Sequence, residues 1–456
     1  MSMEDYRNRQ VVVLGLAKSG VAVAKLLHRF GAQVVVNDKK PREEAAGVEE
    51  LEALGITVIT GHHPDDLIHE NLSLVVKNPG IPYEAPPVAK ALALHIPVVT
   101  EVELAYQICK APIIGITGSN GKTTTTTLVG LILEKANIDS VVGGNIGTPL
   151  CSLAETMRED QYLVAELSSF QLMGTDAFRP KIGALLNLYP AHLDYHHTKE
   201  AYLAAKLRLF SSQTEEDVAI LPQDQLEELS PLPPMRGQVF TFSQKVAVKK
   251  GVFIQDGVIL FADGQGQVEE VMPVSALAIP HVENALAAIL ITKLAGADYA
   301  SMAEVLSTFP GVEHRMEYVA TVDDVRYYND SKATNPEAAS RAIQAFTEPI
   351  VLIAGGLDRG ITFSELVPVM QKHVKAIVTY GETAEILLQR AQEAGISERC
   401  RVDTVEKAVV TAASLAQPGD VVLLSPACAS WDLYPSFEVR GSMFKDGVHR
   451  LKTSLA

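Results

Sequence analysis

Short runs of apolar, mostly β-branched residues alternate with longer amphipathic stretches along most of the chain. The apolar runs lie at 11–14, 34–36, 113–116, 163–165, 351–353 and 421–424. Strands that are apolar on both faces are typical of parallel sheets covered by helices. Helical periodicity follows several of these runs, as at 21–30 and 123–136. The pattern therefore predicts an α/β protein built on parallel sheets.

Three segments of the chain each repeat this alternation, and we expect three domains. They are residues 1–102, which open with a glycine turn, residues 103–310 and residues 311–456. The outer two segments predict Rossmann-like α/β domains, and the central one predicts a parallel sheet of the P-loop ATPase type. A strand-like, turn-punctuated stretch at 238–273 predicts a small added β region in the central domain.

Composition and charge narrow the range of partners. The chain has 456 residues, of which 47% are hydrophobic, and a formal net charge of −16. This charge argues against a nucleic-acid or anionic-membrane partner. The chain has no apolar run of membrane-spanning length, no secretory signal and no CxxC pair among its four cysteines, so we expect a cytoplasmic protein, and a monomer.

A glycine-rich loop carries the strongest chemical signal. The apolar strand 113–117 leads into Gly118-Ser119-Asn120-Gly121-Lys122-Thr123, and a helix follows. Backbone N–H groups of such a loop and the helix N-terminus attract phosphate. Lys122 can reach the β- and γ-phosphates of a nucleotide, and the Thr123 hydroxyl can bind Mg²⁺. The loop is shorter than the full G-x-x-x-x-G-K-[ST] motif, because Ile116 stands at the position of its first glycine.

The first glycine turn resembles a dinucleotide-binding motif with one change. In Gly15-Leu16-Ala17-Lys18-Ser19-Gly20 the middle glycine is replaced by Ala17, whose Cβ would crowd a diphosphate, and Asp38 follows the next strand. This pattern favours a mononucleotide-binding domain with altered diphosphate contacts. A turn that binds nothing and an NAD-dependent dehydrogenase are the alternatives.

Three side chains of the central segment are candidates for metal chemistry. Glu166 ends a predicted strand, as a Mg²⁺ ligand beside a phosphate loop does, and His192 follows another strand. Taken alone, each pattern favours a structural residue over a catalytic one. Lys206 lies in a helical pattern that by itself favours a solvated lysine. The neighbouring His196-His197 pair is expected on the surface.

These motifs occur in the order found in the Mur ligases of peptidoglycan synthesis, which the chain resembles over its whole length. The motifs are the 118–123 loop, Glu166-Leu167-Ser168-Ser169-Phe170-Gln171 and His281-Val282-Glu283-Asn284-Ala285-Leu286-Ala287-Ala288. Two further motifs, 329–335 and 425–430, resemble those of members that add D-glutamate to UDP-N-acetylmuramoyl-L-alanine with ATP as co-substrate.

The resemblance implies a role for each candidate residue. ATP contacts are expected from Gly118, Ser119, Asn120, Gly121, Lys122, Thr123, Thr124, Asn284, Arg315 and Asp330. Two Mg²⁺ ions are expected, with Thr123 and Glu166 at one and His192 and a carbamylated Lys206 at the other. The uridine nucleotide substrate is expected at Leu16, Ala17, Asp38, Lys39, Asn78, Gly80, Asn145, Ser168 and Gln171. D-Glutamate is expected at Lys332, Thr334, Arg359, Ser430 and Phe437.

The resemblance also implies a reaction, in which Lys122, His192, Lys206 and Lys332 take the catalytic roles. A carboxylate attacks the γ-phosphate of ATP, and the acyl phosphate is then attacked by an amine. Arg359 departs from the family pattern, since some members have lysine there, but either cation can bind a carboxylate. A ligase with another acceptor, such as a folate polyglutamate ligase, and a non-enzymatic nucleotide sensor are the alternatives.

Overall fold

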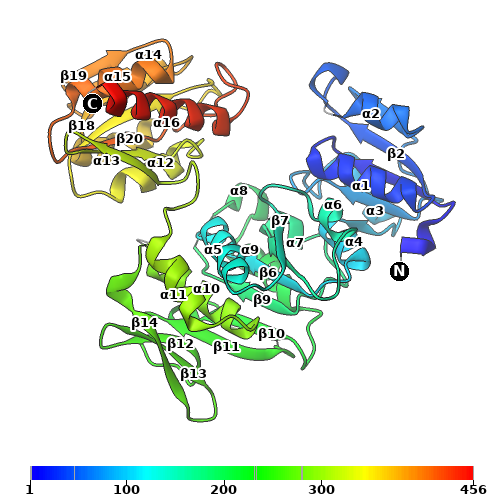
Figure 1. Cartoon of the computed structure of the whole chain (residues 1–456). Coiled ribbons are helices and arrows are strands. Elements are labelled where there is room, and N and C mark those ends of the chain that lie inside the picture. Colours follow the sequence, from blue (N-terminus) through cyan, green and yellow to red (C-terminus); the bar gives the residue numbers. More distant parts are fainter. Residues whose placement is uncertain are drawn as a thin grey trace. The chain divides into compact units, whose positions relative to one another are not determined.

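The computed structural model describes residues 3–45, 47–189, 191–230, 232, 234–278 and 281–454. The chain divides into two compact units, Met1–Phe309 and Pro310–Ala456. The first unit contains two sheets and the second contains one, each with helices packed against it (Figure 1). The three α/β domains expected from the sequence are therefore confirmed. Within the described ranges, no helix has the length and apolarity that crossing a bilayer needs.

The first sheet is parallel throughout and has five strands. In sheet order they are β3 (Thr57–Thr60), β2 (Gln33–Asp38), β1 (Gln10–Leu14), β4 (Leu74–Lys77) and β5 (Val98–Val99). Its helices are α1 (Lys18–Arg29), α2 (Val48–Ala53), α3 (Pro86–Ala93) and α4 (Glu101–Ile108). Along β1, Val11 and Val13 share a core with α1, whereas Val12 and Leu14 pack with α3. The apolar run at 11–14 is explained by this burial on both faces.

The second sheet has nine strands and continues into the predicted β region. In sheet order they are β14 (Val268–Pro273), β13 (Val258–Asp263), β12 (Lys250–Gln255), β11 (Gln238–Ser243), β10 (Val218–Pro222), β9 (Ile182–Leu185), β6 (Ile113–Thr117), β8 (Tyr162–Glu166) and β7 (Ser140–Gly144). Pairing is parallel from β7 to β12 and antiparallel from β12 to β14. The stretch at 238–273 thus extends the central sheet itself.

The helices of the central sheet surround its middle strands. They are α5 (Lys122–Lys135), α6 (Leu150–Ala154), α7 (Ser169–Leu172), α8 (Leu193–His196), α9 (Lys199–Leu207), α10 (Val282–Leu294) and α11 (Tyr299–Thr308). Helices α10 and α11 both pack against α5, as Figure 1 shows. Nine consecutive residues of α10, from Asn284 to Thr292, are buried, which is typical of a helix inside a core. This packing fixes α5 and the loop before it.

The second unit is a doubly wound sheet of six strands. In sheet order they are β15 (Glu317–Val322), β16 (Val325–Asn329), β20 (Val421–Leu424), β17 (Ile350–Gly355), β18 (Val374–Tyr380) and β19 (Glu398–Arg401). Only the β15–β16 pair of this sheet is antiparallel. Alternate residues of β17, β18 and β20 pack on opposite faces. The covering helices are α12 (Pro336–Gln344), α13 (Val367–His373), α14 (Ala384–Glu393), α15 (Val405–Leu415) and α16 (Phe437–Ser454).

The start of α4 joins the first sheet to the central domain through buried polar groups. The Glu101 carboxylate accepts a hydrogen bond from the N–H of Cys151 at the start of α6 (2.6 Å). Thr100 donates its hydroxyl to the carbonyl of Gln171 in α7 (2.6 Å). The Glu103 carboxylate accepts from three successive backbone N–H groups at 176–178. These bonds anchor the connection between the two sheets of the first unit.

Candidate active site

The phosphate loop joins β6 to α5 in the middle of the central sheet. Gly121 caps α5 with a left-handed backbone (φ 79°), a conformation that favours glycine. A Cβ at this position would lie 2.1 Å from Oδ1 of Asn284, so the side chain of Asn284 is packed directly against the loop. The structure thus brings the predicted Asn284 to the predicted loop. Thr123, in the first turn of α5, is buried.

Two lysine amines meet at one carbonyl oxygen of this loop. Lys122 Nζ donates to the carbonyls of Gly118 (2.8 Å) and Ser119 (3.0 Å), and Lys206 Nζ donates to the same Gly118 oxygen (2.8 Å). Lys206 reaches it from α9, and its amine also lies 4.6 Å from the centre of the Tyr202 ring. The loop therefore carries two potential cations where a nucleotide would place its phosphates.

Lys206 is only 1% exposed, which corrects the surface position that its helical pattern favoured. Burial lowers the pKa of Lys206 well below its usual value, and the charge of Lys122 lowers it further. A buried lysine is driven towards the neutral amine. A neutral amine is the form that can react with carbon dioxide, so the surroundings of Lys206 suit carbamylation.

Glu166 lies beside the phosphate strand, since β8 pairs with β6 and Glu166 is opposite Ile116. Its side chain is buried, and Oε1 accepts a hydrogen bond from Nδ2 of Asn145 (2.9 Å). Oε2 is also buried and has no hydrogen-bond partner among the described residues. A buried carboxylate oxygen left without a partner is costly, and a cation would satisfy it.

The donor set around Glu166 fits Mg²⁺ better than a metal held by protein alone. Among the described residues, no group of three or more His, Cys, Asp or Glu side chains could hold a metal ion. Mg²⁺ is commonly bound by one or two carboxylates together with phosphate oxygens and water. Glu166 and the Thr123 hydroxyl are suited to such an ion, with the nucleotide supplying the other ligands.

His192 lies on the same side of the central domain as Lys206, separated from it by an aromatic ring. His192 is exposed, has a positive φ of 56° and directly precedes α8. Its ring is 5.1 Å from that of Phe170 and 6.3 Å from that of Tyr202, whose face is under the Lys206 amine. The structure brings His192 and Lys206 to one aromatic cluster.

His196 corrects a second expectation. It was expected on the surface beside His197, but it is buried, and its Nε2 lies 2.9 Å from the hydroxyl of Ser169. Its ring stacks on Phe170. The two histidines are adjacent in sequence, and His197 is exposed because α8 ends between them.

Asn187 and Glu283 shape the phosphate loop, although the sequence did not single them out. Asn187 Oδ1 accepts from the N–H of Asn120 (2.9 Å), and its carbonyl accepts from the N–H of Ser119 (3.1 Å). Its Nδ2 donates to Glu283 (3.2 Å), a residue whose pKa is raised by burial. Asn187 follows β9, the strand beside β6, so its place at the end of a neighbouring strand was the available signal.

The candidate residues for the uridine nucleotide meet at the carboxyl ends of β1, β2 and β4. Asp38 Oδ2 accepts from the N–H of Leu16 (2.6 Å). Asn78 Oδ1 accepts from the N–H of Gly80 (3.1 Å), and a Cβ on Gly15 would lie 2.8 Å from the Cβ of Asn78. Ligands of open α/β sheets bind at this edge. Ala17, the N-cap of α1, and Lys39 are both exposed there.

The candidates in the central domain for the same substrate bond to one another or to Glu166. Asn145 contacts the Glu166 carboxylate, as described above. Ser168 and Gln171 form a capping box at the start of α7, in which the Ser168 N–H donates to Gln171 Oε1 (2.9 Å). Their hydrogen bonds therefore hold α7 at the end of β8.

In the second unit, Asp330 and Arg315 lie close to each other. Asp330 follows β16, and its carboxylate accepts from the Ser425 hydroxyl (3.0 Å) and the Met316 N–H (3.2 Å). Burial raises the pKa of Asp330 to about 7, while Ser425, the Met316 N–H and the Arg315 charge lower it. Arg315 has a buried Nε without a hydrogen-bond partner among the described residues.

The candidates for D-glutamate are spread over three loops of this sheet. Lys332 Nζ lies 5.4 Å from the centre of the Phe437 ring, and Ser430 has a buried hydroxyl without a hydrogen-bond partner in the described structure. Arg359 is exposed and stacks on the ring of Trp431, 5.0 Å from its centre. Thr334 is half-buried beside Lys332.

Arg440, which the sequence did not single out, ties these loops together. It is fully buried in α16, and its guanidinium donates to the hydroxyl and carbonyl of Ser331 (2.9 and 2.8 Å). It also donates to the carbonyls of Cys428 (3.1 Å) and Gly355 (3.5 Å). A rigid guanidinium can hold several carbonyls in fixed positions.

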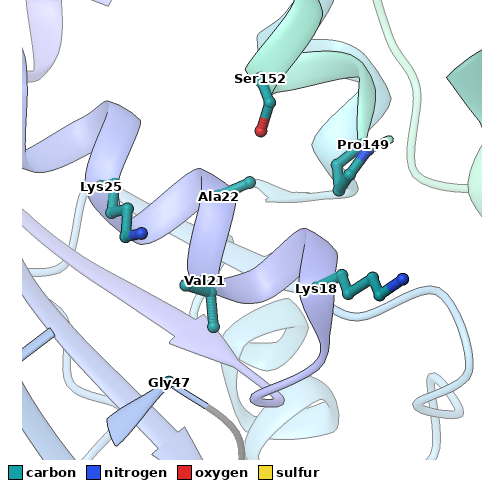
Figure 2. Close-up of a pocket in the computed structure, with 7 residues that line it drawn as sticks. All are labelled: Lys18, Val21, Ala22, Lys25, Gly47, Pro149 and Ser152. Atoms are coloured by element: carbon teal, nitrogen blue, oxygen red, sulfur yellow. The ribbon is translucent and has the colours of Figure 1, made fainter. Parts of the chain in front are cut away.

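A cavity of 340 Å³ lies in the first unit, between α1 and the start of α6 (Figure 2). It is lined by Lys18, Val21, Ala22, Lys25, Gly47, Pro149 and Ser152. Figure 2 shows the four α1 side chains on one side and Pro149 and Ser152 on the other. None of these seven residues is a candidate site residue. Lys18 directly follows the candidate Ala17 in the sequence, so the cavity begins next to the candidate nucleotide residues.

Comparison with known proteins gives the same family over all parts of the chain. Residues 9–100 match the family described as Mur ligase MurD-like, N-terminal domain. Residues 116–292 match the Mur ligase middle domain, and residues 314–428 match the Mur ligase, glutamate ligase domain.

Two curated relatives carry the same name, UDP-N-acetylmuramoylalanine--D-glutamate ligase. The protein of Geobacillus kaustophilus (strain HTA426) is 51% identical over 451 residues, covering 98% of this chain and 99% of the relative. That of Bacillus mycoides (strain KBAB4) is 49% identical over 453 residues, covering 99% of both chains.

Solved structures at lower identity share the fold. UDP-N-acetylmuramate-alanine ligase MurC from Thermotoga maritima has a TM-score of 0.56 and 19% identity, covering 98% of this chain and 99% of its own. MurF ligase from Thermotoga maritima, in complex with ADP, has a TM-score of 0.54 and 17% identity, covering 100% and 97%.

Proposed function

The chain belongs to the Mur ligase family, and we propose that it joins D-glutamate to UDP-N-acetylmuramoyl-L-alanine in the synthesis of peptidoglycan precursors. ATP supplies the energy and is converted to ADP and phosphate. The observation that carries the substrate assignment is the 51% identity, over 98% of this chain, to a relative named for this reaction. The four free thiols suit a reducing compartment, which supports a cytoplasmic reaction.

Each domain takes one substrate in this proposal. Residues 1–102 bind the uridine nucleotide through Leu16, Ala17, Asp38, Lys39, Asn78 and Gly80. Residues 103–310 bind ATP through the phosphate loop from Gly118 to Thr124 and Asn284, and place the reacting end of the nucleotide substrate near Asn145, Ser168 and Gln171. Residues 311–456 bind D-glutamate, and their Arg315 and Asp330 are further ATP contacts. The convergence of the first group at one sheet edge supports the assignment.

The first chemical step forms an acyl phosphate. A carboxylate oxygen of the nucleotide substrate attacks the γ-phosphorus of ATP, the bond to the β,γ-bridging oxygen breaks, and ADP leaves. The loop N–H groups and Lys122 stabilise the negative charge on the phosphate oxygens. The Lys122 amine already donates to the carbonyls of Gly118 and Ser119, which hold it at the loop.

In this proposal, two Mg²⁺ ions would balance the negative charge of the phosphate oxygens. Thr123 and Glu166 would hold one, and His192 and a carbamylated Lys206 would hold the other. The ions supply Lewis-acid stabilisation of the phosphate oxygens. The orphaned Glu166 Oε2 and the depressed pKa of Lys206 support this assignment.

The second step forms the amide. The neutral amine of D-glutamate attacks the acyl carbon, the tetrahedral intermediate loses phosphate, and the amine gives up a proton. Lys332, Thr334, Arg359, Ser430 and Phe437 are proposed to hold D-glutamate. The cationic side chains of Lys332 and Arg359 can pair with the two carboxylates of D-glutamate. The buried Ser430 hydroxyl has no hydrogen-bond partner among the described residues, and bound D-glutamate could supply one.

Phosphate release from ATP tests the proposal. With UDP-N-acetylmuramoyl-L-alanine present, release should depend on D-glutamate and should not occur with L-glutamate, L-alanine or L-lysine. Lys122→Ala, with an unchanged melting temperature, should lower the rate by about 10²–10³-fold or more, as loss of one charge-stabilising donor does. Release with a different amino acid would overturn the acceptor. Binding of both nucleotides without any release would favour a sensor.

A further inference from the structure

Lys77 is a buried lysine at the end of β4, immediately before the proposed nucleotide loop at 78–80. It is 1% exposed. Its Nζ donates to the carbonyls of Ile81 (2.9 Å) and Pro79 (3.1 Å), and to the hydroxyl of Tyr195 (3.4 Å). An ammonium has three N–H donors, so all of them are used. The buried Lys77 therefore fixes the two carbonyls of this loop to which it donates.

Tyr195 holds the same loop from the central domain. It belongs to α8, and its hydroxyl oxygen lies 3.1 Å from the carbonyl of Ile81 and 3.4 Å from that of Pro79, so its single O–H donates to the nearer, Ile81. The Ile81 carbonyl is thus bonded from both domains of the first unit, whereas the Pro79 carbonyl is bonded by Lys77 and has the Tyr195 hydroxyl close by. The face of the Tyr83 ring, 4.6 Å from the Lys77 amine, closes the cluster.

The cluster uses a cation where a neutral residue would be cheaper to bury. Burial lowers the pKa of Lys77 to about 8, and the charge of Glu84 raises it, so the amine stays largely protonated at neutral pH. The Glu84 carboxylate lies 3.8 Å from His197, and within the described ranges no carboxylate forms an ion pair with Lys77. A buried ammonium costs free energy unless its hydrogen bonds are satisfied. Here the satisfying groups are the loop carbonyls and one hydroxyl of the other domain.

Tyr195 is also fixed to the residues proposed for phosphate chemistry. Its N–H donates to the carbonyl of His192 (3.1 Å), since α8 begins directly after that residue. Its ring meets the ring of Phe170 edge-on at 4.6 Å, and Phe170 in turn lies 5.1 Å from the His192 ring. A shift of the loop carbonyls would therefore displace Tyr195, whose N–H is bonded to the His192 carbonyl.

We propose that Lys77 and Tyr195 form a latch that couples the uridine-nucleotide loop to the His192 segment, so that both are positioning residues for the reaction. The proposal rests on the proposed function, because it takes the nucleotide to bind at 78–80. It predicts that a hydroxyl of the central domain contributes to nucleotide binding in the first domain.

The test measures the affinity for UDP-N-acetylmuramoyl-L-alanine by calorimetry without ATP, so that turnover does not enter. Tyr195→Phe keeps the ring packed on Phe170 and removes only the hydroxyl. It should weaken binding about three- to tenfold, the usual effect of a lost hydrogen bond. Lys77→Met should weaken binding at least as much. The double variant should be little worse than Lys77→Met alone, because both changes break one network.

Matched controls make the same chemical changes elsewhere in the unit. Lys90→Met removes an amine that also donates to a backbone carbonyl (Asp65, 2.6 Å), and Tyr106→Phe removes the hydroxyl of a ring packed on Phe178. Neither should change the affinity. Unchanged binding by Tyr195→Phe would overturn the latch even if Lys77→Met failed to fold. Independent, additive losses would overturn it too. A wild-type protein that does not bind the nucleotide substrate would instead overturn the proposed function.

Discussion

At the scale of single residues, two lysine amines meet at the phosphate loop. Lys122 and Lys206 donate to the same carbonyl oxygen of Gly118, and burial, together with the charge of Lys122, lowers the pKa of Lys206. Such an arrangement costs stability and is retained where function uses it. We therefore expect both lysines to lower the stability of the fold while serving the reaction.

Lys206→Met tests directly whether the buried amine lowers the stability of the fold. Methionine fills a similar volume and leaves no amine to bury. The pKa of Lys206 in the folded protein is depressed, so its contribution to stability is complete only above the unfolded pKa and falls as the pH drops through the folded value. At pH 7 the variant should thus melt higher, by roughly 2 °C or more if about 1 kcal/mol is relieved, and should release no phosphate from ATP.

The matched control for that variant is Lys199→Met in the same helix, whose side chain is exposed. It should change neither the melting temperature nor the rate. A Lys206→Met protein that melts lower than wild type would contradict the view that this amine is a burden to the fold. Calorimetry and a phosphate-release assay on the same samples give both readouts.

Some site residues could be predicted from the sequence and others could not. The loop from Gly118 to Thr123 is local, so its motif and the helix after it fix its form. Lys206 is buried because α9 packs over the loop, and a nine-residue helix with mixed composition does not reveal that contact. Asn187 and Arg440 act through bonds to backbone groups distant in sequence, for which a single chain gives no motif.

At the scale of elements, strands were predictable because they are buried on both sides. The β1 run is apolar at every inner position since α1 and α3 cover opposite faces. The sequence correctly predicts strands at 238–273. That these strands extend the central sheet depends on the pairing of β10 with β11, which a local sequence pattern does not reveal.

The connection between the two sheets of the first unit should depend on Glu103. Its carboxylate is the acceptor for three successive N–H groups at 176–178. Phe178 is buried, whereas Asp176 and Ala177 are exposed, so water can replace the carboxylate at two of the three groups. Glu103→Ala should therefore cost about 1–3 kcal/mol in the free energy of unfolding, mainly from the unsatisfied Phe178 N–H. Urea denaturation measures the change.

Glu103→Gln is the matched comparison, because an amide oxygen can still accept from part of this set. It should lose clearly less stability than Glu103→Ala. Equal stability of wild type and Glu103→Ala would contradict the role of this residue as an anchor.

Glu101, the first residue of α4, is expected to make the stability of the protein depend on pH. Burial raises its pKa from 4.5 to about 7, while hydrogen bonds from Cys151 and Leu150 lower it. A carboxyl group whose pKa is raised by folding adds stability that is complete below its unfolded pKa and is lost as the pH rises through the folded value. Between pH 4.5 and 7, Glu101 should therefore make the protein less stable as the pH rises.

Glu101→Gln removes that titration but keeps an oxygen acceptor for the Cys151 N–H. The variant should be more stable than wild type at pH 8, by on the order of 2 kcal/mol, and the gain should shrink towards pH 5. Melting temperatures across this range are the measurement. A difference between the two proteins that does not change with pH would contradict the raised pKa.

At the scale of the whole molecule, the chain combines three α/β domains in two compact units, and its relatives match it from end to end. Each sheet presents candidate residues at the carboxyl ends of its parallel strands, where open α/β sheets bind ligands. Three such edges suit a reaction with three substrates. What joins the three substrates chemically is the acyl phosphate.

The transfer of an oxygen atom tests that central claim most directly. UDP-N-acetylmuramoyl-L-alanine labelled with ¹⁸O in both carboxylate oxygens is incubated with ATP, Mg²⁺ and D-glutamate, and the phosphate and amide products are weighed by mass spectrometry. If the carboxylate attacks the γ-phosphorus, each phosphate released carries one ¹⁸O and the amide retains the other. Unlabelled phosphate would mean that water attacks ATP, and it would contradict the acyl-phosphate ligase described here.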